Sequence, residues 1–184
     1  MNNIIIENKG TITLGEKVMV SDPCYGLGTW CQGVLENVLP GVYDCSVEYS
    51  DEGDWGIRVV AIEVTHKSCR GKFIVLDLED FEVGVDSGQA GIFDYEYYAK
   101  YHKDSTESEH VDDDWYDMVC DLTHKNNGNT THCLGLVSSS GFGDGGYNCW
   151  TYKNEDGKIV AIRVEFITED DYEDEDYEEE YDYE

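Results

Sequence analysis

Apolar and polar residues alternate along much of this chain, in short runs that turn residues separate. In VYDCSVEY, residues 42–49, the side chains of Tyr43, Cys45 and Val47 share one face and polar residues occupy most of the other. A period of two is the pattern of a half-buried β-strand. WGIRVVAIEVTH, residues 55–66, is long enough for a central strand, and SDEGD between the two segments predicts a hairpin.

The same signals predict most of the remaining chain to be β-strand. Gly15-Glu16 and Lys9-Gly10 break the first strands apart, and Asp156-Gly157 is a strong turn signal for a hairpin between the last two. The further strands are expected at residues 4–7, 11–14, 17–21, 73–78, 81–85, 132–139, 146–153 and 158–166.

Residues 94–125 break this pattern, because they are rich in Tyr, Asp, Glu and His and do not alternate. Residues 94–102 and 112–124 read as two short helices. In the second, Trp115, Val119 and Leu122 recur at helical spacing, and the three aspartates 112–114 suit a helix N-terminus.

The predicted fold class is mainly β, either a β-sandwich or a partly open antiparallel β-barrel, with a small helical insertion around 94–125. An α+β fold is the alternative. Residues 1–168 are expected to form one globular β-rich domain. Residues 169–184 hold twelve acids and four tyrosines without a base, and they are expected to be an acidic tail that is disordered when unbound.

The charge of the chain restricts its partners. The sequence has 41 acidic and 12 basic side chains, a formal net charge of −29, and without the tail it still has 29 acids against 12 bases. Contact with phosphates needs Lys and Arg, so direct binding to nucleic acid is not expected. A basic protein partner or a small ligand is favoured, and the tail tyrosines suit packing on Arg and Lys side chains.

The cysteines and the N-terminus indicate the compartment. MNNIIIENKG has no basic segment before an apolar stretch, and no run approaches the roughly 20 apolar residues of a membrane span, so a soluble protein without membrane contact is expected. The seven cysteines form no CxxC pair and are expected to be free thiols in a reducing cytoplasm. The competing hypothesis is a zinc site assembled from His66, Cys69, His132 and Cys133.

Three loops place an acid among small residues directly after a predicted strand. They are VSDPCYG at 20–26, GVDSGQAGIFD at 84–94 and SSSGFGDGGY at 138–147. Pro23 restricts Asp22 to an extended backbone, which would hold its carboxylate at a defined angle. Each loop taken alone is most simply a turn in which an aspartate caps its own backbone.

Taken together, the three loops predict a shared site. In the second loop Gly88 and Gly91 would let the backbone approach a ligand or another strand closely. No cofactor is expected, but carboxylates at this density could bind Mg²⁺ or Ca²⁺, for which the candidate ligands are Asp22, Asp86 and Asp144. The predicted ligand-binding residues are Asp22, Tyr25, Asp86, Ser87, Gln89, Asp94, Ser140, Asp144 and Tyr147.

Four segments occur in an order that resembles a known family: GEKVMVSDPCY, GVYDCSVEY…WGIRVVAIEV, VGVDSGQAGIFD and SSSGFGDGGYNCWTYKNEDGKIVAIRVEF. They resemble the bacterial and phage family filed as domain of unknown function 4241, over about residues 15–167. The resemblance implies an intracellular protein without an established activity, in a bacterial cell or an infected host cell. The Gln89-Ala90 step and the acidic tail depart from the family pattern. The positions that match it are Asp22, Pro23, Asp86, Gly88, Phe93, Asp94, Gly141, Gly143, Asp144, Gly145 and Tyr147.

Two functions of different classes fit the sequence. The leading hypothesis is a non-enzymatic binding or inhibitor protein of bacterial or phage origin, of the counter-defence or immunity type. It would act through its acidic surface and a pocket lined by Gly and Asp. The alternative is a metal-assisted hydrolase that uses Asp22, Asp86 and Asp144. Ser87 and Ser140 have no histidine nearby in the sequence, and Cys24 has no evident activator. Clustering of the three carboxylates would favour the hydrolase, and dispersal would favour the binding protein.

Overall fold

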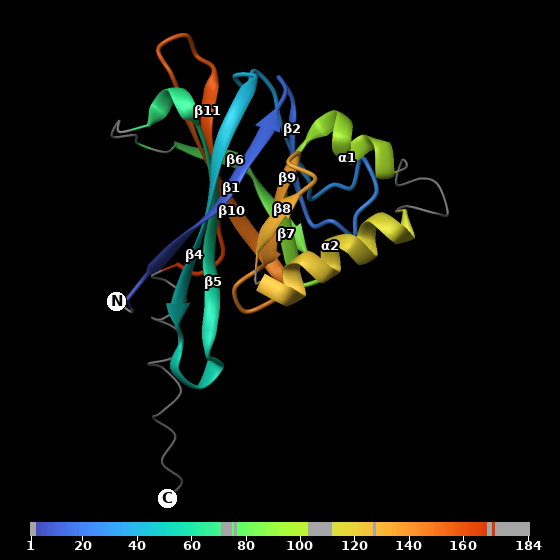
Figure 1. The fold of residues 1–184 in the computed structure, drawn as a ribbon, viewed down its shortest axis with the longest axis vertical. Coiled ribbons are helices and arrows are strands. Elements are labelled where there is room, and N and C mark those ends of the chain that lie inside the picture. Colours follow the sequence, from blue (N-terminus) through green and yellow to red (C-terminus); the bar gives the residue numbers. More distant parts are fainter. Residues whose placement is uncertain are drawn as a thin grey trace, which may run out of the picture.

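Two antiparallel sheets and a pair of helices form three layers in the part of the chain that the computed structural model describes, which is residues 3–70, 75, 77–102, 112–126, 128–168 and 171 (Figure 1). The six-stranded sheet has the order β1-β4-β5-β11-β10-β6, and the five-stranded sheet has the order β3-β2-β7-β9-β8. The mainly β prediction with a small helical part is confirmed, and the arrangement is a β-sandwich.

The elements follow one another as strands, then helices, then strands again. Two short 3-10 helices, Gly53–Trp55 and Lys67–Cys69, flank β5. The strands and helices are β1 (Ile5–Leu14), β2 (Val18–Ser21), β3 (Gly33–Leu35), β4 (Gly41–Asp51), β5 (Ile57–His66), β6 (Asp77–Val85), β7 (Gln89–Asp94), α1 (Tyr95–Tyr101), α2 (Asp113–Asn126), β8 (Asn129–Thr131), β9 (Gly135–Ser139), β10 (Gly145–Lys153) and β11 (Ile159–Glu165).

Both predicted hairpins are confirmed, as are both helices. Strands β4 and β5 pair antiparallel, and so do β10 and β11 around the Asp156-Gly157 turn. The first turn of α2 is capped by Asp112, whose Oδ1 accepts from the backbone N–H of Trp115 at 2.9 Å. These elements depend on local signals, namely turn chemistry and amphipathic period, which are visible in the sequence.

The predicted break at Lys9-Gly10 is wrong, because β1 runs through it as one strand. Its pairing with β4 shifts register between Asn8 and Gly10. Gly10 has a φ of 91°, and its N–H donates to Oδ1 of Asn8 at 2.8 Å. A glycine with positive φ accommodates a β-bulge, so the strand bends without ending.

The strand β7 lies in a segment that was predicted to be a loop. It pairs with β2 on one side and β9 on the other, which makes it the central strand of the five-stranded sheet. Ile92 packs into the core between the sheets, and Phe93 packs on the opposite face against the helices. A strand buried on both faces does not alternate, which is why the pattern did not indicate it. The short strands β3 and β8 were also missed. Three of the six residues of the predicted strand 73–78 lie outside the described residues, and residues 77 and 78 belong to β6.

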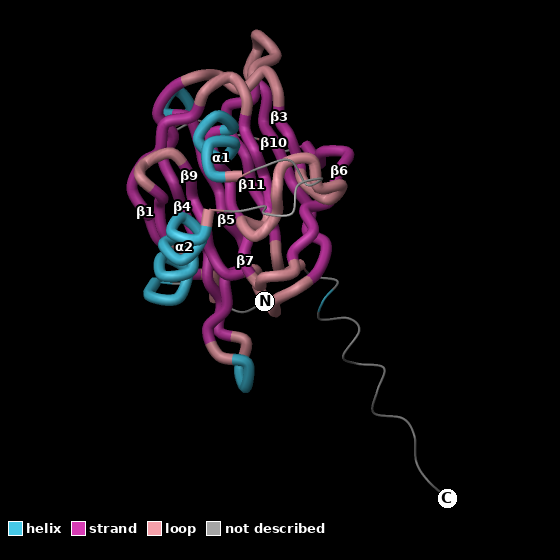
Figure 2. The backbone as a smooth tube through the Cα atoms, turned by 90° about the vertical axis from the view of Figure 1, so that its right-hand side faces the viewer, coloured by secondary structure: helices cyan, strands magenta, loops and turns pink. Residues whose placement is uncertain are grey.

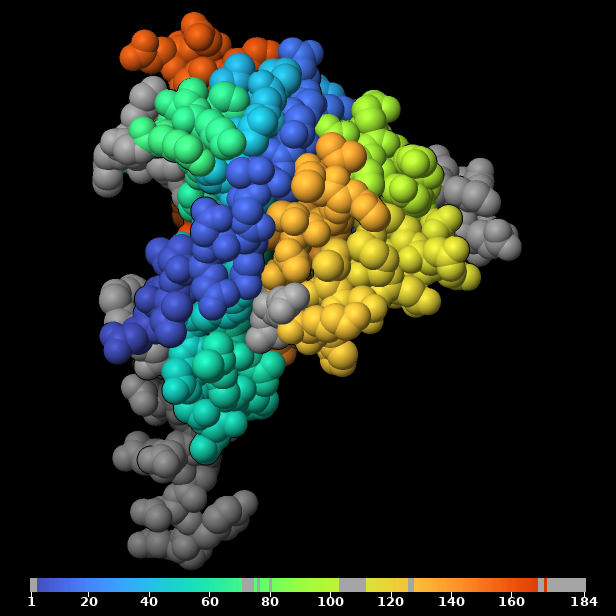
Figure 3. All heavy atoms as spheres, viewed as in Figure 1, coloured from blue at the N-terminus to red at the C-terminus, as the bar shows by residue number. Residues whose placement is uncertain are grey.

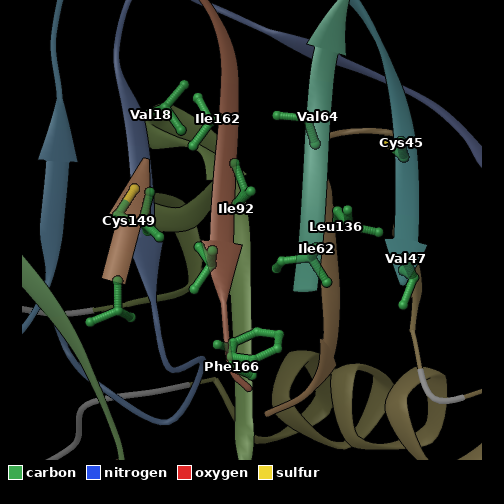
Figure 4. Packing of buried hydrophobic residues seen from close by; sticks show 14 of the residues in the cluster. Val18, Cys45, Val47, Ile62, Val64, Ile92, Leu136, Cys149, Ile162 and Phe166 are labelled. Carbon is green, nitrogen blue, oxygen red and sulfur yellow. The ribbon is translucent and has the colours of Figure 1, made fainter. Parts of the chain in front are cut away.

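The main hydrophobic core fills the space between the two sheets. Val47, Ile62 and Ile162 from the six-stranded sheet meet Ile92 and Leu136 from the five-stranded sheet (Figure 4). Each such side chain contributes about 1.5–3 kcal/mol relative to an exposed one. The sandwich is therefore a rigid support for the loops at its ends.

A second, aromatic core joins the helices to the outer face of the five-stranded sheet. The rings of Phe93, Tyr98 and Trp115 pack together with centroids 5.2–6.0 Å apart. The Nε1 of Trp115 donates to the hydroxyl of Tyr97 at 2.9 Å. In Figures 2 and 3 the two helices gather on one side of the strands. Neither helix in the described part of the chain has the length and apolar character needed to cross a membrane.

His102 is buried at the end of α1, with its ring stacked on Tyr98 at 3.6 Å and edge-on to Trp115. Its Nδ1 lies 2.7 Å from the carbonyl oxygen of Tyr98, and its Nε2 lies 3.1 Å from that of Pro23. Burial lowers the pKa of His102, and this outweighs the two carbonyls and Asp112, which raise it. The folded protein therefore favours the neutral imidazole.

This lowered pKa predicts a loss of stability in acid. As pH falls through about 6.5, the unfolded chain binds a proton at His102 before the folded chain does, so the free energy of unfolding decreases. We expect the stability advantage of wild type over His102→Gln, measured by urea unfolding, to be smaller at about pH 5.5 than at about pH 8. An advantage that grows in acid would contradict this and would mean that the two carbonyls hold an imidazolium.

Candidate functional site

Two crossings between the sheets meet at one end of the sandwich. Residues 86–88 lead from β6 in the six-stranded sheet to β7 in the five-stranded sheet, and residues 140–144 lead back from β9 to β10. The backbone N–H of Ser140 donates to the carbonyl of Gly88 at 3.1 Å, which joins the two crossings. The glycine-rich loop is thus a connection between sheets and not a hairpin.

Asp22, directly after β2, holds the 86–88 turn from inside the protein. Its side chain is 0 % exposed. Oδ2 accepts from the N–H groups of Asp86 and Ser87 at 2.9 and 2.7 Å, and Oδ1 accepts from Ser87 Oγ and the N–H of Cys24 at 2.7 and 2.8 Å. Four donors satisfy both oxygens, so this carboxylate acts as a buried backbone cap.

Asp144 holds the same turn from the outside. It is exposed, and its Oδ1 accepts from the N–H of Gly88 at 3.1 Å. Gly141 and Gly143 have φ values of 56° and 122°, a region that glycine adopts far more easily than other residues. Tyr147 closes the loop, because its hydroxyl lies 2.6 Å from the carbonyl oxygen of Gly143. The glycines therefore give the crossing its path and bring Asp144 to Gly88.

Two further predicted ligand-binding residues also support the backbone. Asp94 caps α1, with Oδ1 accepting from the N–H of Tyr97 at 3.0 Å and Oδ2 from the N–H of Gly15 at 2.9 Å. The hydroxyl of Ser140 donates to the carbonyl of Gly143 at 2.7 Å. Like Asp22 and Tyr147, these side chains have partners within the protein.

Three of the predicted residues, Tyr25, Asp86 and Asp144, line one pocket, which we call the acidic pocket. Its volume is about 630 Å³. Glu82 adds a third carboxylate and Trp30 a second ring, and neither was predicted. The remaining lining residues are small or apolar: Thr29, Cys31, Gly84, Val85, Gly145 and Gly146.

Tyr25 and Trp30 give the acidic pocket an aromatic wall. Burial raises the pKa of Tyr25, and its hydrogen bond with the carboxylate of Asp86 raises it further, so the phenol stays neutral and donates to Asp86. Trp30 is 93 % exposed. The sequence signal for it was a tryptophan in the glycine-containing loop YGLGTW, where no core position demands a large ring.

The other two predicted residues, Ser87 and Gln89, line a different cavity of about 380 Å³ on the helix side of the turn. The nine predicted ligand-binding residues therefore separate into three groups. One lines the acidic pocket, one lines this second cavity, and one supports the backbone.

The three carboxylates predicted as metal ligands do not lie in one place. Asp22 accepts from four donors in the protein interior, whereas Asp86 and Asp144 lie at the acidic pocket. Among the described residues, no group of three or more His, Cys, Asp or Glu side chains is placed to hold a metal ion. His66, Cys69, His132 and Cys133, which are all described, therefore do not come together as a zinc site in this structure. All seven cysteines are unpaired.

The thiol of Cys24 and the phenol of Tyr116 lie near Asp22, and the pKa of each is raised. Burial, followed by the neighbouring carboxylate of Asp22, raises the pKa of Cys24 well above its ordinary value, which disfavours the thiolate. Burial likewise raises the pKa of Tyr116 to about 12. Neither side chain is therefore favoured in its anionic, nucleophilic form.

The three converging loops lie within a match to a family model described as "Protein of unknown function (DUF4241)", over residues 15–164. The chain belongs to this family. The chain itself matches none of the curated proteins and none of the solved structures. In this DUF4241 protein, the family match covers β2 to β11 apart from the final residue of β11, and it includes both crossings and the acidic pocket.

Proposed function

We propose that this DUF4241 protein is a non-enzymatic binding protein, of the counter-defence or immunity type, whose acidic pocket receives a cationic side chain of a basic protein partner. The observation that carries the proposal is the lining of the pocket. Three carboxylates and two aromatic rings surround about 630 Å³, and the described lining residues include no Lys, Arg or His.

Charge favours a cation at this place. The described residues of the pocket wall place no Lys, Arg or His beside Glu82, Asp86 and Asp144, and the whole chain carries −29. A cleft lined by one sign of charge concentrates ions of the opposite sign and steers their approach. An Arg or Lys side chain would neutralise these carboxylates, whereas an anion would be repelled.

The aromatic wall favours a cation that is presented by a protein surface. Trp30 stands almost fully in water, and Trp is the best aromatic partner for a Lys or Arg head group. Exposed Trp and Tyr side chains are also common hot spots of protein interfaces. Carboxylates and rings together match the guanidinium of arginine, which can donate two parallel hydrogen bonds to a carboxylate while its plane stacks on an aromatic ring.

Titration calorimetry with a hexa-arginine peptide at low salt tests the proposal. The double variant Asp86→Asn/Asp144→Asn removes two charges from the pocket, while Asn at 144 keeps an acceptor oxygen for the N–H of Gly88 and Asn at 86 keeps one for the hydroxyl of Tyr25. We expect it to weaken binding by about tenfold. Trp30→Ala should weaken it by about threefold.

The matched control is Glu155→Gln/Asp156→Asn, which removes the same charge from the β10–β11 turn at the far end of β10. It should weaken binding by less than about threefold, since only long-range attraction is lost. Equal weakening by the two double variants would contradict the proposal, because attraction would then depend on net charge alone.

A further inference from the structure

Strand β1 forms one edge of the six-stranded sheet, and its first half is apolar and open to solvent (Figure 3). Ile4 directly precedes the strand, and Ile5 and Ile6 begin it; these residues are 52 %, 58 % and 64 % exposed. Successive side chains of a strand point to opposite faces, so both faces of this edge are apolar. Single exposed apolar residues are common, but a run of them on an edge strand is a template for pairing with another chain.

The other half of the same edge is covered within the protein. Ile12 is buried in the core, and the N–H of Thr13 donates to the carbonyl of Cys133 at 2.8 Å. The bulge between the two halves bends the strand. Bulges and covering segments are usual protections of a sheet edge. Residues 3–8 are all exposed in the described structure, so the unprotected part of the edge is the part that carries the isoleucines.

We propose that residues 3–7 pair antiparallel with the same residues of a second copy of this chain, about a two-fold axis at Ile5. In this register Ile5 faces its own counterpart, Ile4 faces the counterpart of Ile6, and Glu7 faces that of Asn3. The two six-stranded sheets become one continuous sheet. The assembly closes as a dimer, because both copies use the same edge.

The charges of this segment favour a second copy over a basic partner. Residues 3–10 contain one acid and one base, and Nζ of Lys9 lies 2.7 Å from Oε2 of Glu7. A basic segment would therefore find no net charge here, unlike at the acidic pocket. Like charges directly opposite one another destabilise a sheet. The register about Ile5 avoids them, whereas a register about Glu7 would bring two glutamates together.

Salt dependence separates this proposal from the proposed function. Each copy carries −29, which opposes dimerisation over long range, so added salt should tighten the dimer. The same salt should weaken the binding of hexa-arginine to the acidic pocket. The pocket takes Glu82 and Gly84 from β6, at the opposite edge of the same sheet, so it stays open in the dimer. Either proposal can therefore fail without the other.

Sedimentation equilibrium at about 0.15 M salt is the test, and the wild type should show twice the 20.9 kDa of one chain. Ile5→Glu and Ile5→Lys each place two like charges across the axis, so each variant alone should dimerise at least about a hundredfold more weakly. An equal mixture of the two variants should recover the dimer, because the introduced carboxylate then faces the introduced ammonium. Both variants should keep the wild-type melting temperature, since Ile5 is an exposed residue.

The matched control is Ile57→Glu and Ile57→Lys, because Ile57 is 60 % exposed on β5, inside the same sheet. Neither should change the dimer. A dimer that survives Ile5→Glu, or a mixture that does not recover it, would overturn the proposal. Assemblies larger than a dimer would also overturn it, because β1 would then pair with a different edge. So would a monomeric wild type, and if deletion of residues 169–184 then produced a dimer, the acidic tail would be the occupant of the edge.

Discussion

Asp22→Ala is expected to destabilise the protein by about 3–5 kcal/mol, which is among the largest effects of any single substitution at this end of the sandwich. The change leaves three backbone N–H groups and the hydroxyl of Ser87 without their acceptor in a site that excludes water. Asp22→Asn should cost about 2–3 kcal/mol, because its amide keeps one acceptor oxygen and turns an NH₂ toward donors. Urea unfolding monitored by tryptophan fluorescence measures both.

The control for this prediction is Asp144→Asn. Asp144 caps the same turn, but it is exposed and its one backbone bond needs only an acceptor oxygen, which Asn retains. Its cost should be below about 0.5 kcal/mol. Similar unfolding midpoints for Asp22→Ala and Asp144→Asn would contradict the view that Asp22 is the buried support of the site.

Gly91→Ala is expected to destabilise the protein by about 3 kcal/mol through overpacking. A Cβ at this position would lie 2.3 Å from Cζ of Phe93 and 2.8 Å from the carbonyl oxygen of Leu136. Phe93 is fully buried and a backbone oxygen cannot move aside, so the strand would have to shift. The free energy of unfolding in urea is the measurement.

Phe93→Leu should partly rescue Gly91→Ala, because the shorter side chain gives up the space that the new Cβ needs. The double variant is then less destabilised than the sum of the two single variants, which is a positive coupling between residues in contact. Gly145→Ala is the matched control, since its Cβ would meet nothing closer than 3.5 Å. Simple additivity would contradict the packing explanation and leave backbone conformation as the cause.

The glycines of the second loop show how sequence and structure differ. Gly91 was interpreted as allowing a ligand or another strand to approach, and in the structure its space is filled by Phe93 from the same strand and by the carbonyl oxygen of Leu136 on the neighbouring strand β9. Gly88 has a φ of 67° and donates its N–H to Asp144. The glycines at these two positions indicated that another group packs closely against the backbone there. Which group approaches depends on the register of β7 with β9, and sequence alone does not specify it.

The site could be predicted only in part for the same reason. The three acidic loops were identified because Gly, Pro and Asp carry strong local preferences. Sequence could not tell that Asp22 points inward to the 86–88 turn while Asp86 and Asp144 face a pocket. Glu82 was missed because a glutamate on a strand is ordinary in sequence, and Trp30 was missed because the loop YGLGTW does not by itself say which residues its tryptophan lies beside. Glu82 reaches the pocket because the strand order places β10 beside β6, and the connection that carries Trp30 is joined to β6 by the N–H of Gly84, which donates to the carbonyl of Cys31.

The sequence by itself determined the elements that short-range physics controls. These are the two hairpins, with turn residues between alternating strands, and α2, with its apolar period and acidic start. The tertiary structure decided which strands are central and where the chain crosses between sheets. A strand such as β7 gains its burial from β2 and β9, which are distant in the chain. Its residues therefore show no alternation, and the two pockets exist only because the crossings at 86–88 and 140–144 meet.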